Sequence, residues 1–275
     1  MRKFSHKAMD TEFSVSFGLN EDEALCGAAV AACFARIDEL ELLLTRFNDT
    51  SDVAVIRGLP DGGVATVARE TMDVLVASAR VCAATGGAFD PTVERRNFAE
   101  LTLDVEHVRV GVRKGPVALD FGGIGKGYAL DACAEILRSE QFDLHDWLLD
   151  AGSSTQVIRG GPWTLGDGGR GKGRTRRQTV LRLSDGALSG SGFEVRGEHI
   201  FDVRRGGPAV RWAQSWSRAR TGAVADALST AALALGAREL EAACRELEAG
   251  VLVARAQRPW LDRLRDPLTE FGRVP

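Results

Sequence analysis

Long hydrophobic runs are missing from this 275-residue chain. No stretch reaches the roughly 18 consecutive apolar residues that a membrane-spanning helix needs. The N terminus has basic residues, but Asp10 and Glu12 arrive before any apolar region typical of a secretion signal. We therefore expect a cytoplasmic protein without a membrane span, or an exported one if a signal has been removed.

Cysteine pairs and an excess of positive charge are missing too. The five cysteines form no Cys-x-x-Cys pair, and each lies in an apolar helical pattern: Cys26, Cys33, Cys82, Cys133 and Cys244. This argues against a disulfide framework and predicts buried, reduced thiols. The net charge of −3 gives no reason to expect nucleic acid as a partner.

Helical and strand patterns alternate without a steady strand–helix–strand rhythm. This predicts an α+β fold in which mixed or antiparallel sheets pack with helices. Asn20 and Glu23 resemble a capping box and predict a helix to about Phe47. Its expected core face is Cys33, Ile37, Leu40, Leu44 and Phe47. A second expected helix, about 69–85, has its apolar face at Met72, Leu75, Val76, Ala79 and Cys82.

The rest of the chain supplies shorter elements. Helices are predicted over residues 128–142, 223–235 and 237–248, and strands over 13–17, 108–110, 117–119, 147–149, 179–183, 199–203 and 251–254. We expect one domain over residues 1–275. The alternative is a domain made of two closely packed subdomains. A stretch at about 159–177 is rich in glycine and basic residues and predicts a mobile surface loop.

The most informative stretch runs from Val117 to Asp131. Asp120 follows a short apolar run, and four glycines with one lysine come next: Gly122, Gly123, Gly125, Lys126 and Gly127. A glycine turn between a strand and a helix start predicts free backbone N–H groups beside a lysine, which suits a phosphate. The alternative is a tight structural turn, because this stretch contains neither GxGxxG nor a complete P-loop.

Two further segments carry polar side chains that could bind a metal or act as a base. Asp226 and Thr230 lie four apart on a predicted helix, with Ser229 adjacent, and their oxygens are ligands that Mg²⁺ accepts. The alternative is a threonine that bonds back to its own helix. His199 precedes Asp202 by three residues and could deprotonate a hydroxyl, although a lone histidine is more often structural.

These pieces together resemble the ApbE family, the FAD:protein FMN transferases. The resemblance extends over most of the chain, in order, through seven segments: Ala8–Thr11, Thr45–Asp52, Gly87–Thr92, Leu119–Asp131, Asp150–Gly152, His199–Asp202 and Ala225–Ala231. The third, fourth and last of these are the most specific. The resemblance implies Mg²⁺-dependent transfer of FMN from FAD to a Ser or Thr hydroxyl of a partner flavoprotein, with release of AMP.

The resemblance also implies roles for single residues. The FAD site would be lined by Met9, Phe47, Ala88, Phe89, Asp90, Asp120, Lys126 and Ile200. The metal would be held by Gly123 through its carbonyl, by Asp226 and Thr230, and by Ser229 as a further hydroxyl. His199 matches the histidine that the family uses near the acceptor hydroxyl, and Asp226 is the alternative base.

The chain departs from the usual family pattern in several segments. Asp10 replaces a glycine between Met9 and Thr11, and residues 152–155, 190–192 and 203–205 also differ. These differences suit an altered choice of acceptor, or a flavin-binding protein that has lost transferase activity. The alternatives to transfer are therefore a FAD pyrophosphatase, in which water is the acceptor and FMN and AMP are the products, and a non-catalytic FAD-binding protein. We also expect Asp226→Ala to abolish turnover at little cost in stability, on the assumption that Asp226 is an exposed helix residue.

Overall fold

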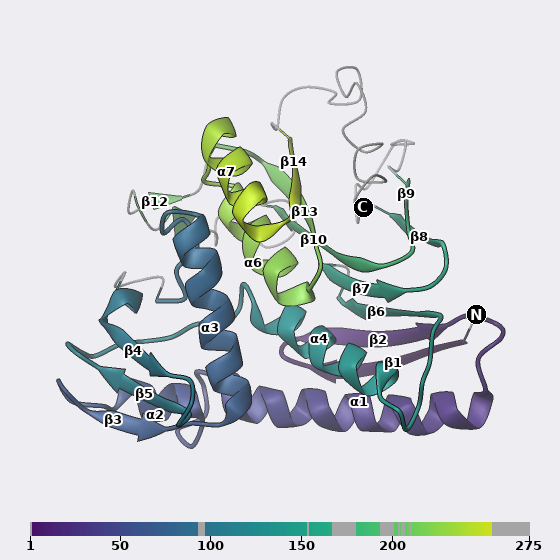
Figure 1. Cartoon of the computed structure of the whole chain (residues 1–275), viewed down its shortest axis with the longest axis horizontal. Helices are drawn as coiled ribbons and strands as arrows, with labels where there is room; N and C mark the ends of the chain where they lie inside the picture. The colour runs from purple at the N-terminus through teal and green to yellow at the C-terminus, as the bar shows by residue number, and fades with distance from the viewer. Residues whose placement is uncertain are drawn as a thin grey trace.

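A computed structural model describes residues 2–92, 97–152, 154–166, 180–192, 201–202, 204, 207–208 and 211–254. It is an α+β structure, as predicted, in which a large antiparallel sheet is covered by helices (Figure 1). No helix in these parts of the chain has both the length and the apolar character needed to cross a membrane.

The large sheet has seven strands in the order β1-β2-β6-β7-β10-β13-β14, and every neighbouring pair is antiparallel. Their bounds are β1 Arg2–Ala8, β2 Thr11–Phe17, β6 Trp147–Ala151, β7 Thr155–Arg159, β10 Gly186–Gly192, β13 Gln214–Ala219 and β14 Gly250–Ala254. The predicted strand at 13–17 is confirmed within β2, and that at 147–149 within β6. The predicted strand at 251–254 lies in β14, which is mostly half-buried.

Small sheets contain the other strands of the described residues. One joins β3 Val64–Thr66, β5 Arg109–Val112 and β4 Leu101–Asp104, next to the 3-10 turn Phe98–Glu100. Another pairs β8 Trp163–Gly166 with β9 Val180–Leu183, and a third pairs β11 Phe201–Asp202 with β12 Gly207–Pro208. The expected loop at 159–177 therefore begins with the end of β7 and with β8, while residues 167–177 lie outside the described residues.

The helices pack against one face of the large sheet and against each other. They are α1 Glu23–Leu44, α2 Asp52–Arg57, α3 Arg69–Ala84, α4 Gly125–Arg138, α6 Gly222–Ala232 and α7 Ala237–Leu247. Helix α4 contacts β6 and β7, and α6 contacts β10 and β13, so these two helices lie directly on the sheet. Helix α1 contacts α4 and also strand β1, and α3 contacts α6 (Figure 1).

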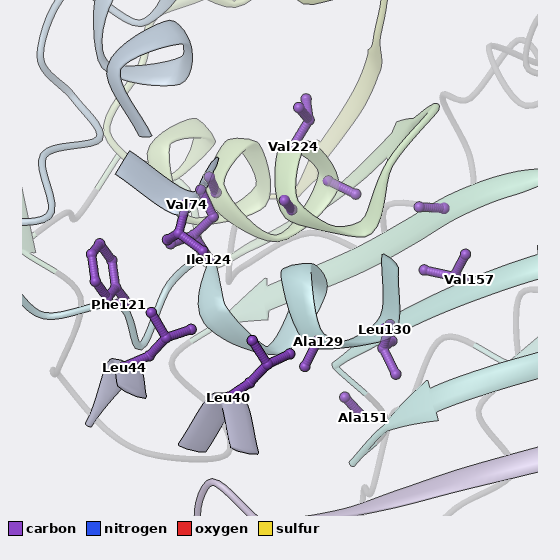
Figure 2. Packing of buried hydrophobic residues seen from close by; sticks show 14 of the residues in the cluster. Leu40, Leu44, Val74, Phe121, Ile124, Ala129, Leu130, Ala151, Val157 and Val224 are labelled. Carbon is purple, nitrogen blue, oxygen red and sulfur yellow. The ribbon is translucent and has the colours of Figure 1, made fainter. Parts of the chain in front are cut away.

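The helical core matches much of the predicted pattern. Figure 2 shows Leu40 and Leu44 of α1, Val74 of α3 and Ile124 before α4 in one buried cluster. The predicted thiols are confirmed: all five cysteines are free, three of them buried and two half-buried. On α3 the buried residues are Thr71, Met72, Val74, Leu75, Ser78 and Val81. The buried face therefore overlaps the predicted face only in part, and Val76 is exposed.

Several predicted element ends were wrong, each for a local reason. The N-cap of α1 is Asp22, whose side chain accepts the Leu25 N–H, and the helix ends at Leu44 because Thr45 adopts an extended backbone. Phe47 is therefore outside the helix and 86% exposed instead of in the core. Val117 and Leu119 are buried, but residues 117–119 form no strand, and α4 begins at Gly125 instead of at 128.

Candidate functional site

The glycine loop between residues 120 and 127 is held by its own hydrogen bonds. Asp120 accepts the Gly122 N–H on Oδ1 at 2.8 Å, and its Oδ2 forms a 3.3 Å ion pair with Arg46. The N–H groups of Ile124 and Gly125 both donate to the Phe121 carbonyl. Since these amides are already paired, the expectation of an open cradle of free N–H groups was wrong for them.

Lys126 supplies the positive charge of the loop. Its Nζ donates to the Gly122 carbonyl at 2.8 Å and lies 3.6 Å from Oδ2 of Asp226. Its side chain is only 15% exposed, so the charge is poorly screened by water. The structure thereby brings the lysine of the loop and the carboxylate of α6 together, although 100 positions separate them in sequence.

Asp226 is buried rather than exposed, with 3% of its surface accessible. Its Oδ2 accepts the Gly127 N–H at 3.1 Å, and its Oδ1 accepts the Ser189 hydroxyl at 3.4 Å. A buried carboxylate needs such donors, because removal from water without them costs several kcal/mol. The earlier assumption that Asp226 is an exposed helix residue was wrong.

The two hydroxyls that follow on α6 point to different neighbours. Both donate back to the Asp226 carbonyl, Ser229 at 2.9 Å and Thr230 at 3.3 Å, as the structural alternative anticipated. Thr230 Oγ1 lies 3.5 Å from the place a side chain at Gly123 would occupy. Ser229 is fully buried and lies 2.8 Å from the Ser191 hydroxyl. A hydroxyl that donates to a carbonyl keeps its lone pairs for another partner.

Strand β10 contributes residues that the sequence reasoning missed. Ser189 lies 2.9 Å from the Thr155 hydroxyl and 3.2 Å from that of Ser229, and Ser191 also reaches Thr230 at 3.4 Å. Serines two apart in a strand point to one face of a sheet. That signal was present in the sequence, because serines alternate in β10 and again at Ser215 and Ser217 of β13.

The remaining residues of the expected flavin site surround the loop. Ala88 and Phe89 are buried, and Phe89 Cε2 lies 3.5 Å from the side-chain position at Gly123. Asp90 Oδ1 accepts the N–H of Thr92 at 2.7 Å and its hydroxyl at 2.6 Å, which shapes this turn. The Asp120 N–H donates to the Pro91 carbonyl at 2.7 Å and joins the turn to the glycine loop.

Two expected residues lie at the end of α1. The Met9 N–H donates to Glu41 Oε1 at 2.8 Å, which places the turn between β1 and β2 beside the last turn of the helix. Phe47 presents its ring to solvent and to the Arg46 guanidinium, 4.9 Å from the ring centroid. Arg46 joins this aromatic ring to Asp120, a link that no sequence pattern signalled. His199 and Ile200 lie outside the described residues.

The oxygen atoms of this site suit a hard divalent cation. A buried carboxylate, a hydroxyl that faces the glycine loop and nearby loop carbonyls are the donor types that Mg²⁺ prefers, with water and phosphate completing its shell. Lys126 already makes ionic and hydrogen-bonded contacts to the same carboxylate and loop. The residues present therefore fit a cation between loop and helix.

The fold and the site define a class: an α+β protein whose lysine-bearing glycine loop faces a helix with a buried carboxylate and hydroxyls. The model of the ApbE family matches residues 9–99 and 93–253. Since these matches cover most of the 275 residues, the chain belongs to the ApbE family, which confirms the resemblance of its motifs.

Solved structures share the fold. The flavin transferase ApbE from Vibrio cholerae superposes with a TM-score of 0.78 at 17% identity, with 92% of each chain covered. The ApbE protein from Thermotoga maritima gives 0.76 at 23% identity, over 92% of this chain and 93% of that one. The apo flavinyl transferase ApbE of Pseudomonas stutzeri gives 0.76 at 19% identity, over 92% and 91%. No curated protein matches the sequence.

Proposed function

We propose that this protein, as one unit over residues 1–275, transfers FMN from FAD to a Ser or Thr hydroxyl of a partner flavoprotein and releases AMP. The observation that carries the proposal is the 3.6 Å approach of Lys126 Nζ to Asp226 Oδ2. A fixed positive charge therefore lies beside the buried carboxylate that we propose as a cation ligand. Membership of the ApbE family and the names of the structural relatives as flavin transferases support the same activity.

The charges of the site suit a pyrophosphate substrate. Lys126 would contact the phosphate oxygens of FAD, while Asp226, Thr230 and the Gly123 carbonyl would hold Mg²⁺, with Ser229 as a further hydroxyl. Mg²⁺ bound there would offset the negative charge that develops on the phosphoryl oxygens. Because the loop amides of Ile124 and Gly125 are bonded internally, positive charge rather than those N–H groups recognises the phosphates.

Some of the expected flavin contacts are linked to the glycine loop by hydrogen bonds or an ion pair. The Ala88–Asp90 turn is joined to the loop through Pro91 and Asp120, and Phe47 leaves an exposed ring beside Arg46. We propose that Met9, Phe47, this turn, Asp120 and Ile200 line the FAD site. An exposed aromatic ring can stack on a planar ligand such as a flavin.

The reaction itself is a displacement at phosphorus. The acceptor oxygen forms a bond to the FMN phosphorus, the bond between that phosphorus and the bridging oxygen breaks, and AMP leaves with the bridging oxygen. The hydroxyl proton passes to a base, for which we propose His199, with Asp226 as the alternative. The chain contributes little covalent chemistry here and acts by position and charge.

The first test identifies the nucleotide products. The full chain is incubated with FAD and MgCl₂, with and without a flavoprotein that has an exposed Thr or Ser, and the products are separated by chromatography. Transfer predicts AMP and a covalently flavinylated acceptor only when the acceptor is present. AMP and free FMN without acceptor would make the protein a FAD pyrophosphatase, and tight FAD binding without AMP a non-catalytic binder.

Asp226→Asn tests the cation site within the same assay. The amide keeps the size of the side chain but removes its charge, so we expect AMP formation to fall by about 10²-fold or more, since a bound metal contributes several kcal/mol. The matched control is Asp52→Asn, because Asp52 accepts the Ala68 N–H at 2.8 Å and the Thr71 hydroxyl at 2.6 Å at the start of α3 and bonds to none of the proposed site residues in these hydrogen bonds. Undiminished turnover in Asp226→Asn would contradict the metal assignment.

A further inference from the structure

The helices α4 and α6 contact each other at a pair of glycines, Gly127 and Gly222. A side chain on Gly127 would come within 2.1 Å of the Gly222 carbonyl oxygen, and one on Gly222 within 2.5 Å of the Gly127 carbonyl oxygen. The two backbones are therefore in direct contact where the helices lie side by side (Figure 1). In each helix an aspartate follows the glycine by four residues: Asp131 in α4 and Asp226 in α6.

These two aspartates bond the first turn of the opposite helix. Asp226 accepts the Gly127 N–H at 3.1 Å. Asp131 accepts the Gly222 N–H on Oδ1 at 2.6 Å and the Ala223 N–H on Oδ2 at 2.8 Å. Residues four apart share a helix face, so each Gly-x-x-x-Asp sequence presents a contact point and a carboxylate to its partner. Both carboxylates also lie at the positive end of the opposite helix.

We propose that Asp131 is a positioning residue for the cation site: by holding the first turn of α6 against α4, it fixes Asp226 and Thr230 opposite the glycine loop. The inference rests on the proposed function, because it assigns a role toward the same cation. Asp131 reaches neither the loop nor Lys126 through any bond that the structure describes, and acts through α6.

The way in which α6 is attached to α4 supports this role. Its own N-cap, Thr221, accepts only a weak bond from the Val224 N–H at 3.4 Å, whereas Asp131 bonds two earlier amides at shorter distances. Asp226 lies one turn after Gly222. A change in how the first turn sits on α4 therefore moves Asp226 directly, and with it the oxygen that faces Lys126.

The test compares metal affinity in Asp131→Asn, Asp52→Asn and the unaltered chain. Mn²⁺ serves as the probe and is titrated by calorimetry with FAD present, at a temperature where urea unfolding shows each protein to be folded. The Asn amide accepts one N–H but turns its NH₂ toward the other. We expect the Mn²⁺ dissociation constant to rise about 10-fold in Asp131→Asn, because residues that orient a metal ligand typically contribute at least that much to metal affinity. In Asp52→Asn the dissociation constant should stay unchanged.

The outcomes separate this inference from the proposed function. Mn²⁺ binding by the unaltered chain with equal affinity in Asp131→Asn would overturn the positioning role and leave the proposed function standing. No Mn²⁺ binding by the unaltered chain would overturn both. If Asp131→Asn does not fold, Asp131→Glu keeps the charge but displaces it by one methylene, and the same loss of Mn²⁺ affinity is expected. Unchanged affinity in Asp131→Glu would then count against the inference.

Discussion

At the scale of single residues, the glycines of the loop differ in what they accommodate. Gly122 accommodates the Asp120 side chain, whose Oδ1 would lie 3.0 Å from an added Cβ, and Gly123 leaves room for Phe89 and Thr230. Gly127 is different, because backbone atoms of another helix occupy the place of its missing side chain. A flexible side chain can move aside, whereas two packed helices must separate, so Gly127 tolerates substitution least.

Gly127→Ala should therefore destabilise the protein. We expect a loss of about 3 kcal/mol in the free energy of unfolding, from overpacking, and a melting temperature lower by roughly 6 °C or more. Urea and thermal unfolding measure both. The control is Gly27→Ala in α1, where an added Cβ meets nothing within 4 Å. There the higher helix propensity of alanine should raise stability by about 0.5–1 kcal/mol, and equal effects at both sites would contradict the packing argument.

Burial also changes what is expected of Asp226. Alanine at this position would leave the buried Gly127 N–H without its acceptor and would remove one acceptor of the Ser189 hydroxyl, at a cost of about 1–3 kcal/mol. The expectation that Asp226→Ala costs little stability fails for this reason. Helical periodicity from alanine and leucine correctly gave the helix, but it could not reveal that the polar face of α6 also lies against strand β10.

At the scale of elements, the joint between α4 and α6 makes stability depend on pH. Burial raises the pKa of Asp131 to about 6, against the lowering effect of its bonds to the Ala223 and Gly222 N–H groups. Glu135 raises this pKa further and Arg138 lowers it. The folded protein therefore binds more protons at Asp131 than the unfolded chain does between about pH 4 and pH 6.

The contribution of Asp131 to the free energy of unfolding should therefore be fully present below about pH 4 and fall as the pH rises to about 6, by up to about 3 kcal/mol. Asp131→Asn cannot titrate, so the difference in stability between the unaltered chain and this variant should shrink or change sign across that window. Urea unfolding at several pH values measures it. Asp52→Asn should keep the slope, and a pH-independent difference for Asp131→Asn would contradict the raised pKa.

The helices and strands also show which sequence patterns were sufficient to predict secondary structure. Long periodic helices such as α1 and α3 were found to within a few residues, because their apolar spacing reflects a single buried face. Strand β1 was missed, since Arg2–Ala8 is mostly polar and only half-buried. Residues 117–119 are as apolar as a strand but pair with none. A short apolar run indicates burial, but it does not show whether the buried segment is a loop or a strand.

At the scale of the whole molecule, the candidate site is assembled from segments that meet only in the folded chain. The end of α1, the Ala88–Asp90 turn, the glycine loop, β10 and α6 all contribute, and bonds from Arg46 to Asp120 and from Ser189 to Asp226 join them. Motif resemblance named most of these segments separately. It could not give the reciprocal bonds of α4 and α6, because these follow from how the helices cross and not from either helix alone.

A site assembled in this way should stabilise the entire fold when it is filled. A ligand at about 100 times its dissociation constant adds roughly 2.7 kcal/mol to the free energy of unfolding, which corresponds to at least about 5 °C in the melting temperature of a chain of this size. We expect FAD with Mg²⁺ to produce such a rise, and Mg²⁺ to add nothing to the effect of FAD in Asp226→Asn. Thermal unfolding with FAD alone, Mg²⁺ alone and both together measures the two contributions. A Mg²⁺-dependent rise of equal size in Asp226→Asn and in the unaltered chain would place the cation away from α6.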